Sequence, residues 1–263
     1  VSNTYAHEIQ TPYYGEGLDG LLRARNQSLV GIVNGIDYSI YNPAKDPLIY
    51  KNYTPKAFKK NKAENKKQLQ KEFGLPVDAS QFVLAIISRL TDQKGLDLID
   101  QVMNDICQDG VQFVILGTGD DRYETMFKYY QEIHPHKISA NIYYSEERSH
   151  KVYAGADAML VPSRFEPCGL TQLMSLRYGT IPIVRETGGL RDTVEPYNEY
   201  EKKGTGFSFA NYKAEELLAT INYAKDVFYN DKENWYGIQE RALNVDYSWE
   251  TSATEYKELY QNI

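Results

Sequence analysis

The sequence predicts an α/β protein with a doubly wound, parallel, six-stranded sheet of the Rossmann-like kind and a helical C-terminus. From residue 82 onward, short apolar runs alternate with segments whose apolar residues recur at helical spacing. Continuous apolar runs are typical of strands buried on both faces, as strands of a parallel sheet are. Six segments have this character: 82–90, 111–119, 138–145, 157–163, 180–187 and 205–210.

The segments between these runs are expected to form helices that cover the sheet, at 95–110, 120–134 and 149–156. The repeated β-α-β order predicts right-handed crossovers and places ligands at the carboxyl ends of the strands. After Ala210 the chain is predicted to be helical, in the segments 213–230, 232–245 and 248–263. Ser248 is the expected N-cap of the last helix.

The segment before the first strand contrasts with the rest of the chain. Residues 1–45 are rich in turn-forming residues, so we expect short elements and connections there. The stretch 52–74 is strongly charged and ends at Gly74, a typical helix stop. Its charge favours a solvated surface helix, and a contact with a polyanion is the alternative.

Composition narrows the possible functions. The 263 residues, 42% of them hydrophobic, suffice for one large or two small domains with a buried core. The formal net charge of −7 gives no overall attraction to nucleic acid. The sequence has no apolar run near the roughly 20 residues that span a bilayer and no secretory pattern, so we expect no membrane association. The chain starts at Val1, and its opening indicates a piece of a longer protein.

Neither the cysteines nor the histidines point to a metal or to nucleophilic chemistry. Cys107 and Cys168 are too few for a disulfide scaffold or a four-thiolate zinc site, and they indicate a reducing, cytoplasmic compartment. Cys168 lies near a helix start that could activate its thiol, but no histidine lies nearby in the sequence. The four histidines lack metal-ligand spacing and are expected to be exposed; they are His7, His134, His136 and His150.

Two cations follow the first predicted strand. Arg89 and Lys94 lie five residues apart, just before Gly95 and the next helix. A planar guanidinium and a point-like ammonium could hold one diphosphate from two sides. The alternative is an ordinary solvated loop with a charged rim.

The segment 162–172 is the densest candidate site. It presents Glu166 at the end of the fourth predicted strand, and Pro167 and Gly169 form a turn into a helix. Backbone N–H groups at such a helix start can bind a sugar hydroxyl or a phosphate oxygen. The alternative is that Glu166 merely occupies a favourable position at a helix N-terminus.

Two glycine-rich turns also follow strands. Gly117 and Gly119 resemble the start of a dinucleotide fingerprint but lack its third glycine, so a simple turn is the favoured interpretation. Gly188 and Gly189 could let the backbone approach a phosphate closely, with a tight turn as the alternative.

Taken together, three motifs resemble the bacterial glycogen synthase and plant starch synthase family. They are S-R-L-T-D-Q-K-G at 88–95, S-R-F-E-P-C-G-L-T-Q-L at 163–173 and T-G-G-L-R-D-T-V at 187–194. The same resemblance holds for S-N-T-Y-A-H-E-I at 2–9, G-L-D-G-L-L-R-A-R at 17–25 and N-G-I-D at 34–37. The resemblance therefore covers essentially the whole chain.

The resemblance implies a two-domain GT-B fold, of which this chain would be the C-terminal domain. It would comprise a tail of the first domain and linker at 1–45, the nucleotide-sugar-binding domain at 46–246, and a helix at 247–263 that packs back on the first domain. The implied reaction is retaining transfer of glucose from ADP-glucose to the non-reducing end of an α-1,4-glucan, without metal or cofactor. The acceptor would bind mainly through the other domain, and this part alone would bind nucleotide better than it catalyses.

The resemblance also implies roles for individual residues. Arg89 and Lys94 would bind the diphosphate and stabilise the departing ADP, and Glu166 would lie beside the glucose. The implied nucleotide-sugar contacts are Tyr144 stacking on adenine, the main chain of Cys168, Gly169 and Leu170 at sugar hydroxyls, and Thr171 at phosphate. The glycine pair Gly188 and Gly189 completes the expected donor site.

Two departures and two alternatives stay open. Met174 stands where broader retaining glycosyltransferases have a second glutamate, which the glycogen synthase branch also lacks, and Tyr41 stands where a tryptophan is common. A UDP-glucose-dependent enzyme of the sucrose-synthase type is the nearest rival, although Cys168 followed by G-L-T-Q favours the glucan synthases. A nucleotide- or glucan-binding module without turnover is the other alternative.

Overall fold

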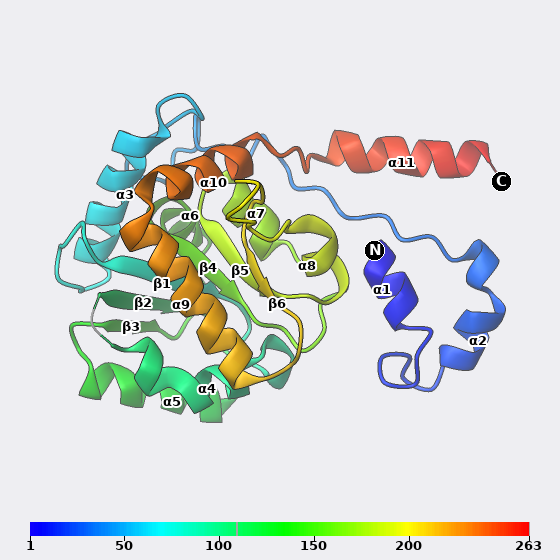
Figure 1. The fold of residues 1–263 in the computed structure, drawn as a ribbon, viewed down its shortest axis with the longest axis horizontal. Helices are drawn as coiled ribbons and strands as arrows, with labels where there is room; N and C mark the ends of the chain where they lie inside the picture. The colour runs from blue at the N-terminus through cyan, green and yellow to red at the C-terminus, as the bar shows by residue number, and fades with distance from the viewer. Residues whose placement is uncertain (109, 263) are drawn as a thin grey trace.

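The computed structural model describes residues 1–108 and 110–262. It confirms the predicted sheet, whose six parallel strands lie in the order β3-β2-β1-β4-β5-β6 (Figure 1). The strands are β1 Phe82–Ile87, β2 Val111–Leu116, β3 Ile138–Asn141, β4 Ala158–Val161, β5 Ile181–Arg185 and β6 Phe207–Phe209. The strand order reverses between β1 and β4, which is where ligands bind in open α/β sheets.

Helices cover both faces of this sheet, as expected for a doubly wound fold (Figure 1). The described α-helices are α1 Asn3–Glu8, α2 Asp19–Ala24, α3 Phe58–Glu72, α4 Leu96–Ile106, α5 Asp121–Ile133, α6 Glu146–Gly155, α7 Thr171–Arg177, α8 Gly188–Thr193, α9 Ala214–Asn230, α10 Lys232–Asn244 and α11 Trp249–Gln261, of which α1, α2 and α11 do not cover the sheet. Two 3-10 helices, η1 Asn26–Ser28 and η2 Asp92–Lys94, complete the described elements.

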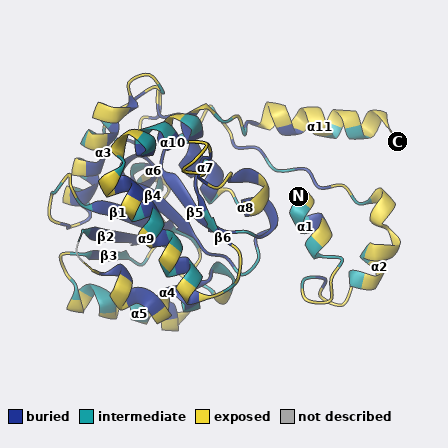
Figure 2. Cartoon of the chain, in the orientation of Figure 1, coloured by how far each residue is buried: buried dark blue, intermediate teal, exposed yellow. Residues whose placement is uncertain are grey.

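Each face of the sheet has its own hydrophobic core. On β1, Phe82, Leu84 and Ile86 pack with α4, α5 and α9, whereas Val83 and Ala85 pack with α3, α6 and α8. This alternation follows from the two-residue period of a strand. Each fully buried large apolar side chain contributes about 1.5–3 kcal/mol, so the two cores fix the sheet and with it the strand ends (Figure 2).

Within the charged stretch at 52–74, Phe58–Glu72 form α3, and the helix stops before Gly74 as predicted, but one face of this helix is not solvated. Lys62 and Lys66 are each only 6% exposed. The Lys62 ammonium donates hydrogen bonds to the carbonyl of Ala154 at 3.1 Å and to the Thr180 hydroxyl at 2.6 Å. The interpretation as a purely solvated helix is therefore wrong, because carbonyls and a carboxylate from other elements pair the lysines.

The histidine prediction is correct for His7 and His136, which are exposed, and wrong for His150. His150 is 1% exposed, and its Nδ1 lies 2.6 Å from Asp46 Oδ2. Burial alone would lower the pKa of His150, but the hydrogen bond and charge of Asp46, with a further contribution from Glu146, raise it above its ordinary value. The Asp46–His150 pair therefore connects the segment that precedes α3 with α6.

Both ends of the described chain extend to one side of the sheet domain, as α1, α2 and α11 (Figure 1). Many residues of these three helices are exposed (Figure 2). Ser248 occupies the N-cap position of α11, but its side chain makes no capping bond within the described residues; instead the Asp246 carboxylate accepts its backbone N–H at 2.9 Å.

The domain boundaries at 45 and 247 stay predictions. None of the described helices combines the length and the apolar character that crossing a membrane requires.

We predict that His150→Phe lowers the free energy of unfolding by about 3 kcal/mol at pH 6, because it leaves Asp46 buried without its cation. A histidine with a raised folded pKa stabilises fully below its unfolded pKa of about 6.5, and this contribution is lost as pH rises through the folded pKa. The difference from wild type should therefore shrink toward pH 9. Urea unfolding followed by circular dichroism measures it.

The exposed His136→Phe serves as the matched control and should change stability by less than about 0.5 kcal/mol at either pH. An effect of His150→Phe that stays constant or grows from pH 6 to pH 9 would contradict the assigned charge pair.

Candidate active site

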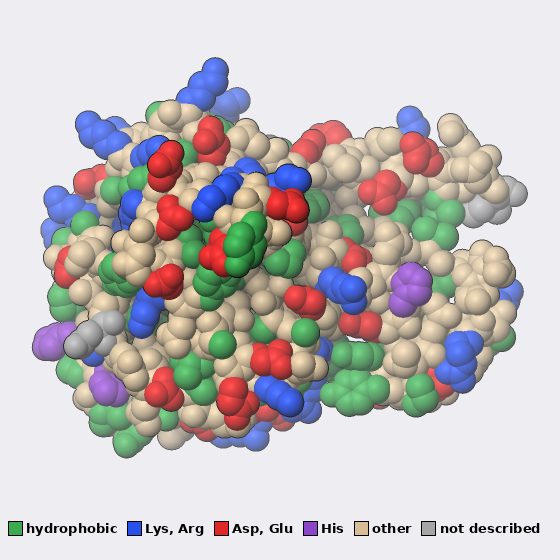
Figure 3. Space-filling view, in the orientation of Figure 1, with side chains coloured by type: hydrophobic (Ala, Val, Ile, Leu, Met, Phe, Trp, Pro, Cys, Tyr) green, Lys and Arg blue, Asp and Glu red, His purple; other side chains and the backbone are tan. Residues whose placement is uncertain are grey.

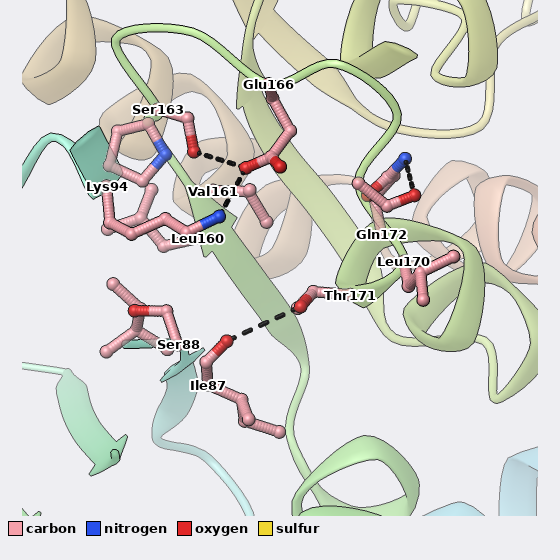
Figure 4. A pocket seen from close by; sticks show the side chains of 13 residues that line it. Ile87, Ser88, Lys94, Leu160, Val161, Ser163, Glu166, Leu170, Thr171 and Gln172 are labelled. Carbon is pink, nitrogen blue, oxygen red and sulfur yellow. Dashed lines mark hydrogen bonds and ion pairs between the residues drawn. The ribbon is translucent and has the colours of Figure 1, made fainter. Parts of the chain in front are cut away.

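A small cavity lies at the carboxyl ends of β1 and β4, at the predicted switch point (Figure 4). Its volume is about 40 Å³. Its lining includes Ile87, Ser88, Lys94, Ser163, Glu166, Gly169, Leu170, Thr171 and Gln172. Five of the ten site residues predicted from the sequence therefore meet at one place: Lys94, Glu166, Gly169, Leu170 and Thr171.

The polar centre of the cavity is an ion pair between Lys94 and Glu166 (Figure 4). Lys94 Nζ lies 2.6 Å from Glu166 Oε2, and the Ser163 hydroxyl donates to the same oxygen at 2.9 Å. Glu166 is 7% exposed. Because a buried carboxylate is costly without a partner, these two donors offset the cost of burying Glu166.

A close backbone approach between two loops brings this pair together. Gly95 follows Lys94 with φ +72°, and a Cβ there would lie 2.1 Å from the Pro162 carbonyl oxygen. The Arg164 N–H also donates to the Gln93 carbonyl at 2.9 Å. The loop after β1 can therefore touch the loop after β4 only with glycine at position 95.

Arg185 holds the loop after β4 from its other side. It lies at the end of β5, is 7% exposed, and donates from Nε to the Ser163 carbonyl at 3.0 Å and from Nη2 to the Arg164 carbonyl at 2.6 Å. Neither Arg185 nor Ser163 was predicted as a site residue from the sequence, although Ser163 opens the motif at 163–173. An arginine at the end of an otherwise apolar run was the available signal for the first of them.

The turn into α7 presents Gly169, Leu170 and Thr171 to the cavity. Gly169 has φ +74°, and the Thr171 hydroxyl donates to the Ile87 carbonyl at 3.4 Å. Cys168 is buried, and its Sγ accepts the Asn34 N–H at 3.4 Å. Burial raises the pKa of the Cys168 thiol, which agrees with the prediction that it is no nucleophile.

The glycine pairs pack loops against one another. Cβ atoms on Gly188 and Gly189 would each lie 2.0 Å from a carbonyl oxygen, of Glu166 and Cys168 respectively. The Gly188 N–H donates to Glu8 Oε1 at 3.1 Å, so a carboxylate of α1 holds the group expected to meet phosphate. A role of this glycine pair in phosphate binding stays a prediction.

The turn interpretation of Gly117 and Gly119 stays a prediction, and both glycines lie close to another loop. A Cβ on Gly117 would lie 1.9 Å from the Ser88 carbonyl oxygen, and one on Gly119 would lie 2.3 Å from that of Leu90. Both glycines therefore serve the close packing of the loop after β2 against the loop after β1.

Arg89 and Tyr144 do not line the cavity. Arg89 is exposed, and its Nη2 donates to Gln93 Oε1 at 3.3 Å. Tyr144 is 79% exposed, and its hydroxyl donates to Glu146 Oε2 at 2.6 Å, a hydrogen bond that raises the pKa of Tyr144. Both follow strands at the same edge of the sheet as the cavity. Among the described residues, no group of three His, Cys, Asp or Glu side chains could hold a metal ion.

We predict that Gly95→Ala lowers the free energy of unfolding by at least about 3 kcal/mol, because it adds a clash with Pro162 to the strain of a left-handed backbone. Gly74→Ala is the matched control: Gly74 has the same φ of +72°, but nothing lies within 4 Å of its added Cβ. It should cost only about 1 kcal/mol. Equal losses in urea unfolding would refute the close loop contact.

Comparison with known proteins identifies the family to which this chain belongs. Residues 66–232 match the family described as glycosyl transferases group 1. A glycogen synthase from Lachnospira eligens is 62% identical over 263 residues, and one from Thermotoga maritima is 52% identical over 261. These matches cover 100% and 99% of this chain and 55% and 54% of the relatives. The chain thus spans about half the length of the curated relatives it matches.

Solved structures agree with this result. The catalytic domain of starch synthase IV from Arabidopsis thaliana, bound to ADP and acarbose, superposes with a TM-score of 0.93 at 35% identity, over 100% of this chain and 54% of that one. HepE from Anabaena, in complex with UDP and glucose, shares the fold with a TM-score of 0.66 at 17% identity, over 95% of this chain and 61% of that one. Since the family match extends over more than half of the chain, this protein belongs to the glycosyl transferases group 1.

Proposed function

We propose that this chain is the donor-binding part of a glycogen or starch synthase. The reaction is retaining transfer of glucose from ADP-glucose to the non-reducing end of an α-1,4-glucan. The observation that carries the proposal is the Lys94–Glu166 pair, which presents a cation and a carboxylate side by side at the switch point of the sheet. A nucleotide-sugar needs this combination, because its diphosphate is anionic and its sugar is rich in hydroxyl groups.

The comparisons support the choice of donor and acceptor. The relatives named glycogen synthase match over essentially the full chain. The starch synthase IV structure holds ADP and acarbose, a nucleotide and an oligosaccharide-like ligand. The structures with UDP share only 16–17% identity, so they support the fold and lend no weight to a UDP-glucose donor.

The proposed reaction depends most on the cations of the site, which stabilise the departing ADP. When the bond between the anomeric carbon and the phosphate oxygen breaks, its electron pair passes to the departing ADP. A lysine ammonium has three donors, so Lys94 can keep its bond to Glu166 and offer another to a phosphate oxygen. Arg89, which is exposed in the same loop, can swing toward the diphosphate. Both would stabilise charge that develops on the leaving group.

The remaining residues fit the sugar and the nucleotide. Glu166 lies beside the space for the glucose, where it can orient hydroxyls or stabilise positive charge at the anomeric carbon. Gly169 and Leu170 line the same cavity, where their backbone groups would bind sugar hydroxyls. Tyr144 offers an exposed ring for stacking on adenine. Because Lys94 and Arg89 are available to stabilise the leaving group, we propose that neither metal nor cofactor takes part.

A cytoplasmic location is part of the proposal. Both cysteines of the chain, Cys107 and Cys168, are free and buried, which suits a reducing compartment. The glucan acceptor would be bound in cooperation with parts that the longer relatives have and this chain does not span.

We predict that the purified chain binds ADP more tightly than UDP, and that Lys94→Gln and Arg89→Gln each weaken ADP binding by roughly 1–3 kcal/mol. The physical reason is the loss of one charge-assisted contact to the diphosphate. Isothermal titration calorimetry measures both affinities. Arg89 is exposed, so its variant tests the site even if Lys94→Gln unfolds.

Lys67→Gln is the matched control, since Lys67 is an exposed residue of α3 that does not line the cavity beside Lys94 and Glu166. It should leave ADP affinity unchanged. Tighter binding of UDP than of ADP would overturn the proposed donor site. An ADP affinity that neither Lys94→Gln nor Arg89→Gln changes would overturn it as well.

A further inference from the structure

A second group of cations converges on a cavity between α3 and α10. Three of its lysines come from α3, namely Lys59, Lys62 and Lys66, and Lys232 is the first residue of α10. Asp157 is the carboxylate among the lining residues. The cavity measures about 170 Å³, which is larger than the space beside Lys94 and Glu166. The proposed donor site uses none of these residues.

This cavity lies at the opposite edge of the sheet from the proposed donor site. Asp157 directly precedes β4, whereas Glu166 lies beyond the other end of that strand. Ala79, which also lines the cavity, precedes β1 in the same way. All strands are parallel, so both positions belong to the amino-terminal edge. A ligand here would be separate from the nucleotide-sugar.

The four lysines fall into two kinds. Lys66 Nζ is paired with Asp157 Oδ2 at 2.7 Å, and Lys62 is satisfied by the carbonyls and hydroxyl described above. Lys232 Nζ instead lies 3.4 Å from the ring centroid of Phe228, and Lys59 Nζ lies 4.6 Å from that of Tyr236. Neither of these two ammonium groups has a carboxylate partner within the described residues.

The cavity therefore holds an excess of positive charge. Its lining contains four lysines and one carboxylate. Burial lowers the pKa of Lys232, and the charge of Lys66 lowers it further against the opposing effect of Asp157. Burial likewise lowers the pKa of Lys62 to about 7. Like charges held this close favour an anion that would relieve their repulsion.

The walls of the cavity add an apolar surface. Phe58, Trp235 and Tyr236 line it beside the lysines. On the outside, Lys and Arg side chains gather over α3 (Figure 3). Cations that lie over aromatic rings beside a small cavity suit a small anion with an organic body better than an extended polyanion.

We propose that this cavity is a binding site for the phosphoryl group of a small phosphorylated metabolite, with Lys59, Lys66 and Lys232 as its cationic contacts. The aromatic walls would cover the organic part of the ligand. The site is distinct from the donor site and does not depend on the function proposed above.

Tryptophan fluorescence can test the proposal directly. The chain has two tryptophans, and Trp249→Phe leaves Trp235 in the cavity wall as the sole reporter. We expect a saturable change on titration with glucose 6-phosphate and none with glucose. Inorganic phosphate serves as the second probe. Equal affinity for phosphate would identify the free ion as the ligand, and weaker affinity would identify a phosphorylated sugar; no saturable change with either overturns the proposal.

Site variants decide whether the signal comes from this cavity. Lys232→Gln and Lys59→Gln, both at exposed positions, should each weaken binding of the tighter probe at least about tenfold, since each removes a charge-assisted contact. Lys67→Gln, exposed on the same helix but outside the lining, should bind like the parent. Unchanged affinity in both cavity variants, or displacement of the probe by ADP, would overturn the assignment. Circular dichroism confirms that each variant is folded.

Discussion

The contact between the loops that follow β1 and β4 is the constraint on which the site depends. These strands are neighbours although they are far apart in the sequence, and their loops meet where Gly95 lies against the Pro162 carbonyl. That contact brings Lys94 next to Glu166. Arg185 holds the loop after β4 by a hydrogen bond to the Ser163 carbonyl. A pair made of one cation and one carboxylate is then available where the sheet reverses its order, which is where a nucleotide-sugar would be bound.

The strand β4 carries a buried carboxylate beyond each end, and each is neutralised by a lysine from another element. Glu166 pairs with Lys94 at the carboxyl edge, and Asp157 pairs with Lys66 at the amino edge. The two edges differ in what surrounds the pair. At the carboxyl edge the cavity offers hydroxyl and backbone groups, which suit a sugar; at the amino edge it offers further lysines and aromatic rings, which suit an anion.

The sequence predicted the sheet well because strands buried on both faces leave unbroken apolar runs that need no knowledge of their partners. It also placed Lys94 and Glu166, since both follow such runs. It failed for His150 and Lys62, whose burial depends on partners such as Asp46 and Thr180 that lie roughly a hundred positions away. A local sequence pattern shows which residues are polar. Only the fold shows which polar groups have hydrogen-bond or ion-pair partners in the interior.

A crystal structure of the chain in complex with ADP would show whether the Lys94–Glu166 pair marks the donor site. We expect the diphosphate at the carboxyl ends of β1 and β4, with an oxygen within hydrogen-bonding distance of Lys94 Nζ and the adenine against the Tyr144 ring. A diphosphate seated elsewhere, at the lysine cavity between α3 and α10 or away from the Lys94–Glu166 pair, would contradict this expectation.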